Sequence, residues 1–311
     1  MSIACAPGKI ILFGEHAVVY GRPALAVPVT QLQATAEVQE SPVAGIWVEA
    51  PDISLHSELT CLPAGHALRT VIESVFRTLN LPAPPPLRIR VTATIPVASG
   101  LGSGAAVSVA IIRALCSFLG QSLSDEQVNA LAYNAEKLYH GTPSGIDNTV
   151  ITYGRPVYFV RGQPIETFRT ARAFTLLIGD TGIPAPTRES VGDVRKLWEA
   201  DRRQWEAVFD AVGEIVRAAR DAIESGHIPA LGPLMNANHA LLQAMTVSGP
   251  ELDRLVLAAR QAGALGAKLS GGGRGGNMIA LVTPERAESV AAALRSAGAK
   301  NTIITTIQEN P

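Results

Sequence analysis

The chain has 311 residues, enough for two domains of ordinary size, and 47% of them are hydrophobic. Lys and Arg number 26 against 27 Asp and Glu, which gives a formal net charge of -1. The sequence contains no basic block that could neutralise a run of phosphates. We therefore expect a soluble globular protein that does not bind nucleic acid.

The cysteines and the N-terminus indicate the compartment. Cys5, Cys61 and Cys116 are far apart and form no C-x-x-C pair, which argues against a disulfide framework or a thiolate metal site. The N-terminus lacks the basic region and cleavage site of a signal peptide, and no uncharged apolar stretch reaches about 18 residues. These observations predict a cytoplasmic protein with no membrane partner.

Ionisable residues follow the first predicted strand. A short strand is expected at residues 2–6, and Pro7-Gly8 is expected to interrupt it just before Lys9. Glu15 and His16 come at the end of the next apolar run, a position where polar groups often line sites. Taken singly, each of these three side chains also fits a solvated turn or surface residue.

The stretch from 87 to 115 predicts a strand, a glycine-rich turn and a helix. Residues 87–95 alternate apolar and polar as a half-buried strand does. Gly100, Gly102 and Gly104 lack a Cβ, so they allow positive φ and a close approach of backbone N–H groups to a ligand. The helix expected at 105–115 would offer its N-terminus to phosphate. An ordinary strand–turn–helix connection also fits, because the P-loop pattern is absent.

The next helix is expected to start at a capping box formed by Ser124 and Gln127 and to run to about His140. Glu136 lies near its end. Asp147 follows a Pro-Ser-Gly turn, where an aspartate serves either as a helix N-cap or as a functional carboxylate.

The second half of the chain is mostly helical. A fresh apolar strand at 174–179 places a domain boundary near residue 165. Helical periodicity runs over 187–222 and recurs further on, and a β-branched strand is expected at 301–307. Strands and helices that mix without a strict βαβ rhythm favour an α+β fold.

The ordered set of motifs resembles the GHMP kinase family. The set covers almost the whole chain, and it is far more specific than any one of its members. Within the family, APGKIILFGEHAVVYG and HGTPSGIDN are most similar to the mevalonate kinases. The segments that carry the resemblance are Pro7-Gly8-Lys9 with Gly14-Glu15-His16, the turn within 95–106, Pro143-Ser144-Gly145-Ile146-Asp147-Asn148, and Lys268-Leu269-Ser270-Gly271-Gly272-Gly273.

The resemblance implies a fold and a reaction. The fold would have two α+β domains, residues 1–165 and 166–311, with the active site in the cleft between them. The reaction would be ATP-dependent phosphorylation of the 5-hydroxyl of mevalonate, with Mg²⁺, in isoprenoid precursor synthesis by the mevalonate pathway. Whether the chain forms a homodimer is left open.

The resemblance also implies roles for individual residues. Asp147 would be the catalytic carboxylate and Lys9 its cationic neighbour. A carboxylate can take the proton of a primary alcohol as the bond to phosphorus forms, and a lysine can hold that carboxylate ionised. The implied magnesium ligands are Glu136 and Ser103, the implied substrate-binding residues are Glu15, His16 and Thr187, and the implied ATP-binding residues are Ala98, Ser99, Gly100, Leu101, Gly102, Ser103 and Gly104.

The chain departs from the family pattern at two positions. Mevalonate kinases usually read GLGSSAA, with a second serine that binds magnesium, but this chain has Gly104 there, so the role of Ser103 stays open. Arg274 interrupts a run that is commonly all small residues. It could contact phosphate or point to solvent, and the sequence favours neither.

Other functions remain as alternatives. A phosphomevalonate kinase would need added basic groups, and the acceptor residues include His16, Arg188 and Arg274 but no dense cluster. A mevalonate diphosphate decarboxylase fits the pattern around Lys9 and Glu15 less well. A non-catalytic ligand-binding protein of the same fold is opposed by the joint presence of Lys9 with the carboxylates of Glu136 and Asp147.

Overall fold

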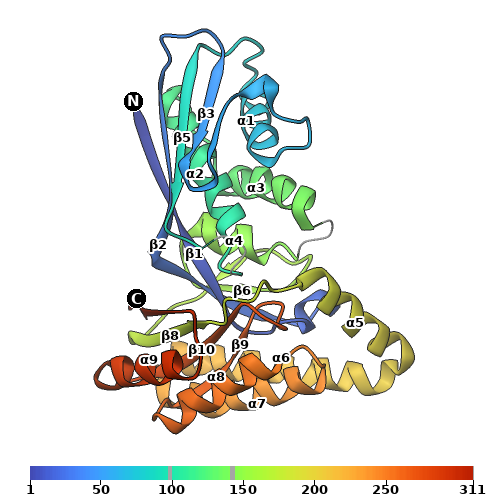
Figure 1. Ribbon diagram of the computed structural model, residues 1–311. Coiled ribbons are helices and arrows are strands. Elements are labelled where there is room, and N and C mark those ends of the chain that lie inside the picture. The colour runs from blue at the N-terminus through green and yellow to red at the C-terminus, as the bar shows by residue number, and fades with distance from the viewer. Residues whose placement is uncertain (97–99, 141–143, 311) are drawn as a thin grey trace. The chain divides into compact units, whose positions relative to one another are not determined.

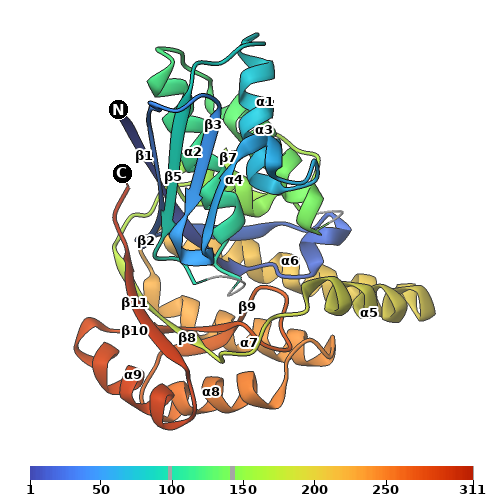
Figure 2. The same cartoon turned by 45° about the horizontal axis from the view of Figure 1, so that its top comes forward.

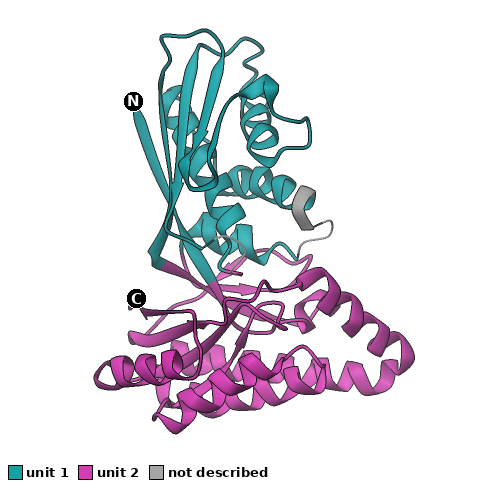
Figure 3. Cartoon of the chain, in the orientation of Figure 1, with its two compact units in different colours: residues 1–9, 30–97, 101–154 teal, residues 10–29, 98–100, 155–311 magenta. Residues whose placement is uncertain are grey.

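The computed structural model describes residues 1–96, 100–140 and 144–310, with 138–140 as backbone only. The chain divides into two compact units, and each is built from several segments (Figure 3). The boundary expected near residue 165 stays a prediction. Unit 1 contains residues 1–9, 30–97 and 101–154, and unit 2 contains residues 10–29, 98–100 and 155–311.

The strands of unit 1 follow the order β4-β3-β5-β2, in which β5 pairs antiparallel with β2 and parallel with β3. Apolar residues alternate along β5, so that Leu87, Ile89 and Val91 are buried. β2 is one continuous strand of 17 residues. The bounds are β2 (Ala24–Glu40), β3 (Ile46–Ala50), β4 (Leu55–Glu58) and β5 (Leu87–Ala93).

β1 (Ser2–Phe13) runs without a break through Pro7 and Gly8, so the expected interruption is wrong. In the described part of the sheet β1 pairs only with β2, and an edge strand tolerates a proline because the missing N–H is not needed by a second neighbour. The N–H of Lys9 donates to the carbonyl of Leu101 (3.0 Å). This bond joins the strand to the glycine-rich turn.

The helices of unit 1 lie along one face of its strands (Figures 1 and 2). α2 is rich in alanine and packs against α1, α3 and α4. The predicted capping box is confirmed: Ser124 N donates to Gln127 Oε1 (2.9 Å), and Gln127 N donates to Ser124 Oγ (3.3 Å). The bounds are α1 (Ala67–Thr78), α2 (Ser103–Phe118), α3 (Asp125–His140) and α4 (Ile146–Tyr153).

Unit 2 contains an antiparallel sheet with the order β11-β8-β10-β9. Residues 24–26 of β2 pair separately with β6, and β6 pairs with β7. The residues of β9 and β10 are all buried. The bounds are β6 (Val157–Phe159), β7 (Glu166–Thr167), β8 (Phe174–Asp180), β9 (Gly266–Ser270), β10 (Asn277–Val282) and β11 (Asn301–Ile307).

The helix expected at 187–222 is two helices, because Asp201 ends the first and caps the second, accepting a bond from Gln204 N (3.0 Å). α7, α8 and α9 pack against the sheet of unit 2 (Figure 1). In the described part of the chain, we find no helix with the length and apolar character needed to cross a membrane. The bounds are α5 (Thr187–Ala200), α6 (Arg202–Glu224), α7 (Leu231–Ala244), α8 (Pro250–Gln261) and α9 (Ala287–Ser296), with 3-10 helices η1 (Ala17–Tyr20), η2 (Pro51–Ile53), η3 (Leu59–Cys61), η4 (Ile228–Ala230) and η5 (Pro284–Arg286).

Side chains of α7 satisfy the outer edge of β9. Ala267 N donates to Asn236 Oδ1 (3.1 Å), and Leu269 N donates to His239 Nδ1 (3.3 Å). Burial lowers the pKa of His239 to about 4, so its ring is neutral at pH 7 and Nδ1 can accept this bond. These two bonds satisfy N–H groups at the edge of β9 and thereby fix the strand, including Lys268 at its centre.

Candidate functional site

The glycine-rich turn leads directly into α2. Gly102 is the N-cap of α2 and adopts a φ of 77°, a conformation that favours glycine. A Cβ on Gly102 would lie 2.7 Å from Ile151 Cδ1 and 2.9 Å from Lys9 Cγ, so only glycine lets the lysine stem pack this closely. Of the residues expected to bind ATP, Ala98 and Ser99 lie outside the described residues.

Lys9 and Asp147 form an ion pair, with 2.9 Å between Nζ and Oδ1. The Lys9 side chain is 4% exposed, whereas that of Asp147 is 33% exposed and open to a small molecule. The N-cap of α4 is Gly145, and Asp147 is the second helical residue, so the alternative that Asp147 is the cap is wrong. Asn148 Nδ2 donates to Asn129 Oδ1 (2.5 Å) and thereby ties α4 to α3.

Glu136, on α3, is buried next to this pair. Its pKa is raised to about 7, chiefly by burial and then by the charge of Asp147, whereas the charge of Lys9 lowers it. A Cβ on Gly104, in the first turn of α2, would lie 3.0 Å from Glu136 Oε1. The missing side chain at position 104 therefore leaves the Glu136 carboxylate beside the helix N-terminus.

The residues expected to bind magnesium suit that ion chemically. Carboxylate and hydroxyl oxygens are the ligands that Mg²⁺ takes from proteins, usually together with phosphates and water. Glu136 Oε1 borders the space that a Cβ of residue 104 would fill, and the half-buried Ser103 is the first residue of the same helix. The donor set therefore fits the expected ion.

We expect Glu136→Gln to stabilise the ligand-free protein at pH 8 but not at pH 5. Between the unfolded pKa of 4.5 and the folded pKa of about 7, the folded state binds more protons, so the wild type loses stability as pH rises. At pH 8 the ionised, buried carboxylate costs up to about 3 kcal/mol, a cost that glutamine avoids. Melting temperatures at both pH values measure the difference.

Glu288→Gln serves as the control, because Glu288 is an exposed carboxylate on α9. Its effect on the melting temperature should be the same at pH 5 and pH 8. If the effect of Glu136→Gln on the melting temperature were also the same at pH 5 and pH 8, Glu136 would not have the raised pKa.

A second group of predicted residues gathers in unit 2. Lys268, on β9, donates to the Glu15 carboxylate and to the carbonyl of Leu269 (2.6 Å). The side chains of Lys268 and Glu15 are 0% and 1% exposed. Burial lowers the pKa of Lys268, and the charge of Glu15 opposes this change. The sequence assigned no role to Lys268, although this residue opens the motif that ends in the glycine run.

His16 and Thr187 both contact Gly272. His16 has a φ of 62°, which is strained for a residue other than glycine, and its Nε2 lies 3.1 Å from the Gly272 carbonyl. Burial lowers the pKa of His16 to about 4, so at pH 7 the neutral ring donates from Nε2 to this oxygen. A Cβ on Gly272 would lie 2.5 Å from Thr187 Oγ1. The structure thus brings Glu15, His16 and Thr187 together around β9 and its following turn.

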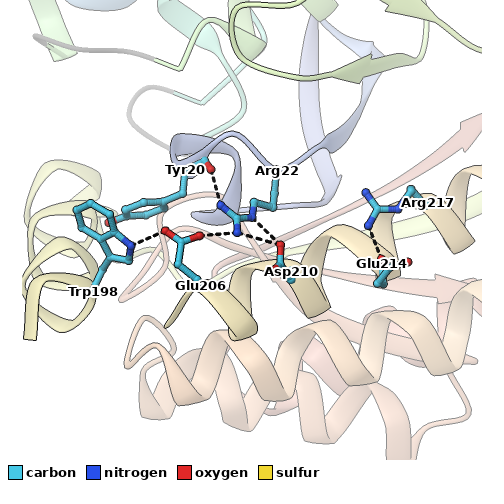
Figure 4. A network of polar contacts seen from close by, with 7 residues as sticks. All are labelled: Tyr20, Arg22, Trp198, Glu206, Asp210, Glu214 and Arg217. Atoms are coloured by element: carbon cyan, nitrogen blue, oxygen red, sulfur yellow. Dashed lines mark hydrogen bonds and ion pairs between the residues drawn. The ribbon is translucent and has the colours of Figure 1, made fainter. Parts of the chain in front are cut away.

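Arg22 fixes the segment that follows His16. Its Nε and Nη2 donate to Asp210 Oδ1 (3.0 and 2.9 Å), it pairs with Glu206, and its Nη1 donates to the carbonyl of Tyr20 (2.9 Å) (Figure 4). The Tyr20 ring stacks on Phe209, with 4.2 Å between centroids. η1 is therefore anchored to α6 by both charge and packing.

Arg274 is held by groups of the protein itself. Its Nη1 lies 2.5 Å from Asp193 Oδ2 on α5, and its Nε donates to the carbonyl of Thr246 (3.2 Å). The structure therefore gives it a carboxylate partner that the sequence did not indicate. Arg188, the other arginine considered for the acceptor residues, is exposed on the first turn of α5.

The chain is similar to known proteins over nearly its whole length. The GHMP kinases N terminal domain matches residues 66–155, and the GHMP kinases C terminal domain matches residues 219–300. The mevalonate kinase of Pyrococcus furiosus is 37% identical over 95% of this chain and 93% of that protein, and the one from Pyrococcus horikoshii is 38% identical over 95% and 92%. The crystal structure of L. major mevalonate kinase in complex with R-mevalonate has 32% identity and a TM-score of 0.85, and the match covers 100% of this chain and 97% of that one.

Proposed function

We propose, from the premise that this chain belongs to the GHMP kinase family, that it transfers the γ-phosphoryl group of ATP to the 5-hydroxyl of mevalonate. The similarity to mevalonate kinases over 95% of the chain supports the choice of acceptor. The observation that carries the chemistry is the Lys9–Asp147 ion pair beside the N-terminus of α2. The expected two-domain α+β fold is that of the family.

In this proposal Asp147 accepts the proton of the acceptor hydroxyl as that oxygen attacks phosphorus. Its partial exposure lets a small alcohol approach, whereas Lys9 is buried and held by its packing against Gly102. The ammonium pairs with the Asp147 carboxylate and stabilises negative charge on the transferring phosphoryl group. The pair therefore combines a base with a fixed positive charge.

The turn before α2 is proposed to bind the phosphates of ATP. The first-turn N–H groups of a 16-residue helix and its dipole attract an anion at Ser103, and Gly102 leaves room for the Lys9 stem beside this helix end. Gly100 also has a positive φ of 79°. The proposal extends to the whole predicted set from Ala98 to Gly104.

We propose that Glu136 and Ser103 hold Mg²⁺. When bound, the ion would neutralise the phosphates of ATP and polarise the group that is transferred. The protein would supply two ligands at the start of α2, the ionised carboxylate of Glu136 and the hydroxyl of Ser103. Because the pKa of Glu136 is about 7, its readiness to bind a cation should increase as pH rises through that value.

The pair Gly104→Ala and Gly104→Ser tests whether a hydroxyl at this position can bind the ion. Alanine adds only a Cβ, which would press on Glu136 Oε1 from 3.0 Å, so it should raise the Mg²⁺ concentration needed for half-maximal activity. Serine adds the same carbon and an oxygen ligand, so it should need less Mg²⁺ than alanine does. Titration of activity with Mg²⁺ measures both, and equal values for the two variants would exclude a role for the hydroxyl.

The acceptor residues are proposed to be Glu15, His16 and Thr187. At pH 7 His16 is neutral and Arg274 is paired with Asp193, so of the three basic residues considered for the acceptor only the exposed Arg188 would offer its charge to an extra phosphate. This observation favours mevalonate over phosphomevalonate. A cytoplasmic location remains a prediction, and whether the chain forms a homodimer is left open.

One experiment tests the proposal. Purified protein with ATP and Mg²⁺ is given mevalonate, phosphomevalonate, homoserine or galactose, and release of ADP is measured. Mevalonate should give the highest kcat/KM. Faster turnover of phosphomevalonate would make the chain a phosphomevalonate kinase, and no acceptor-dependent ADP release would favour the non-catalytic alternative.

A further inference from the structure

Arg274 occupies a backbone conformation that suits glycine better. Its φ is 56°, and the residues on both sides of it, Gly273 and Gly275, also have positive φ. A left-handed conformation is unfavourable for a side chain with a Cβ and persists only where surrounding contacts impose it. Here those contacts are the bond from Arg274 N to Val247 O (2.8 Å) and the side-chain contacts to Thr246 and Asp193.

The turn at residues 271–276, which we call the glycine turn, meets α5 at two points. One is the contact of Gly272 with Thr187, the first residue of the helix. The other is the ion pair of Arg274 with Asp193, between one and two helical turns further along α5. α5 also packs against α6, and these two contacts add a defined position of its first two turns relative to the glycine turn.

Stability alone does not explain this arginine. Its side chain and that of Asp193 are 30% and 37% exposed, and an ion pair at such exposure stabilises a fold little. The unfavourable backbone conformation offsets that gain, and glycine would fit the same φ without cost. What the ion pair does supply is a defined geometry between the glycine turn and α5.

We propose that Arg274 is a positioning residue for the acceptor: by pairing with Asp193, it holds Thr187 against Gly272, whose carbonyl accepts the bond from His16. This inference rests on the proposed function in that it takes His16 and Thr187 as acceptor-binding residues. Arg274 acts through them and does not touch the acceptor. Arg274, which interrupts the glycine run, thus affects how tightly the acceptor binds.

The kinetic test uses Arg274→Gly and Asp193→Asn. Each should raise KM for mevalonate by about 5- to 10-fold and leave kcat and KM for ATP within about 2-fold, because binding geometry changes and the phosphoryl-transfer residues do not. The double variant should be no worse than either single variant, since both remove the same interaction. Arg274→Lys keeps a charge that can reach Asp193 and should recover part of the affinity.

Salt and matched controls separate this pair from surface charge in general. High salt screens an exposed pair, so KM of the wild type should rise toward that of the variants, which should respond less. Arg217 pairs with Glu214 at the same 2.5 Å on α6 (Figure 4), and Arg217→Gln should leave KM unchanged. Lys196→Gln removes the other partner of Asp193 and should also have no effect.

Hydrogen exchange tests the positioning without any substrate. Amides at the start of α5 and in the glycine turn should exchange faster in Arg274→Gly and Asp193→Asn than in the wild type, and in Arg217→Gln they should not. Unchanged exchange would overturn the proposal even if the wild type phosphorylates mevalonate. An increase in KM for ATP confined to Arg274→Gly would overturn it too, because Arg274 would then be a nucleotide contact. If the wild type lacks mevalonate kinase activity but exchange rises as expected, the proposed function fails and the attachment of α5 stands.

Discussion

Asp147→Asn should lower kcat by about 10²- to 10⁴-fold and leave ATP binding and the melting temperature nearly unchanged. The amide keeps the shape of the side chain, but it cannot accept the hydroxyl proton or form an ion pair with Lys9. Stability should change little because the N-cap of α4 is Gly145. Steady-state kinetics and thermal unfolding at pH 8 measure the two effects.

The buried Lys9 keeps a counter-charge in this variant. The Asp147 charge raises the pKa of Glu136, so removing it lets Glu136 ionise more readily beside Lys9. Asp125→Asn is the matched control, since Asp125 pairs with Arg113 (3.0 Å) in the same unit and has no proposed catalytic role. Turnover close to that of the wild type in Asp147→Asn would exclude the proposed base and leave the fold untouched.

Lys9→Met should reduce kcat by about 10²- to 10³-fold, with a smaller change in KM for ATP. Methionine preserves the apolar stem that packs against Gly102, and it removes only the charge. The charge acts mainly as the phosphoryl group is transferred, so its loss appears in kcat. Initial rates over a range of ATP concentrations separate the two parameters.

Lys137→Met is the control for this variant. Lys137 follows Glu136 on α3, and its Nζ lies over the Tyr133 ring at the surface. The Lys137→Met variant should keep nearly full activity.

Lys9→Met should also raise the pKa of Glu136 further, because in the wild type the lysine charge lowers it. An unchanged kcat in Lys9→Met would remove Lys9 from the mechanism.

Local patterns predicted the regular elements well. The strand at 301–307 has the bounds expected from its β-branched residues, and reciprocal bonds start α3 as the Ser124–Gln127 spacing indicated. Prediction from local sequence was wrong where contacts with other parts of the chain determine whether an element continues or ends. A proline breaks most strands but not the edge strand β1, and helical periodicity continued through Asp201, whose capping bond ends one helix and starts another.

The site could be predicted only in part. Lys9 and Asp147 were named from the family resemblance, and no local pattern shows that residues so far apart in sequence form an ion pair. The partners of Glu15 and Arg274, which are Lys268 and Asp193, depend on how distant elements pack within unit 2. The neutral state of His16 likewise follows from burial, which a sequence does not display.

The interleaved composition of the units constrains biosynthesis. Residues 10–29 belong to unit 2, but most of that unit is encoded after residue 155. At about 5–20 residues per second, these apolar residues wait roughly 15–60 s on the ribosome for the rest of their unit. Unit 1 is fully synthesised much earlier, at Gly154, and can begin to fold first. If the gene is cut near residue 165, the C-terminal fragment lacks Glu15, His16 and Arg22. Co-expressed halves should therefore regain activity only if residues 10–29 of the N-terminal fragment pack into the C-terminal fragment.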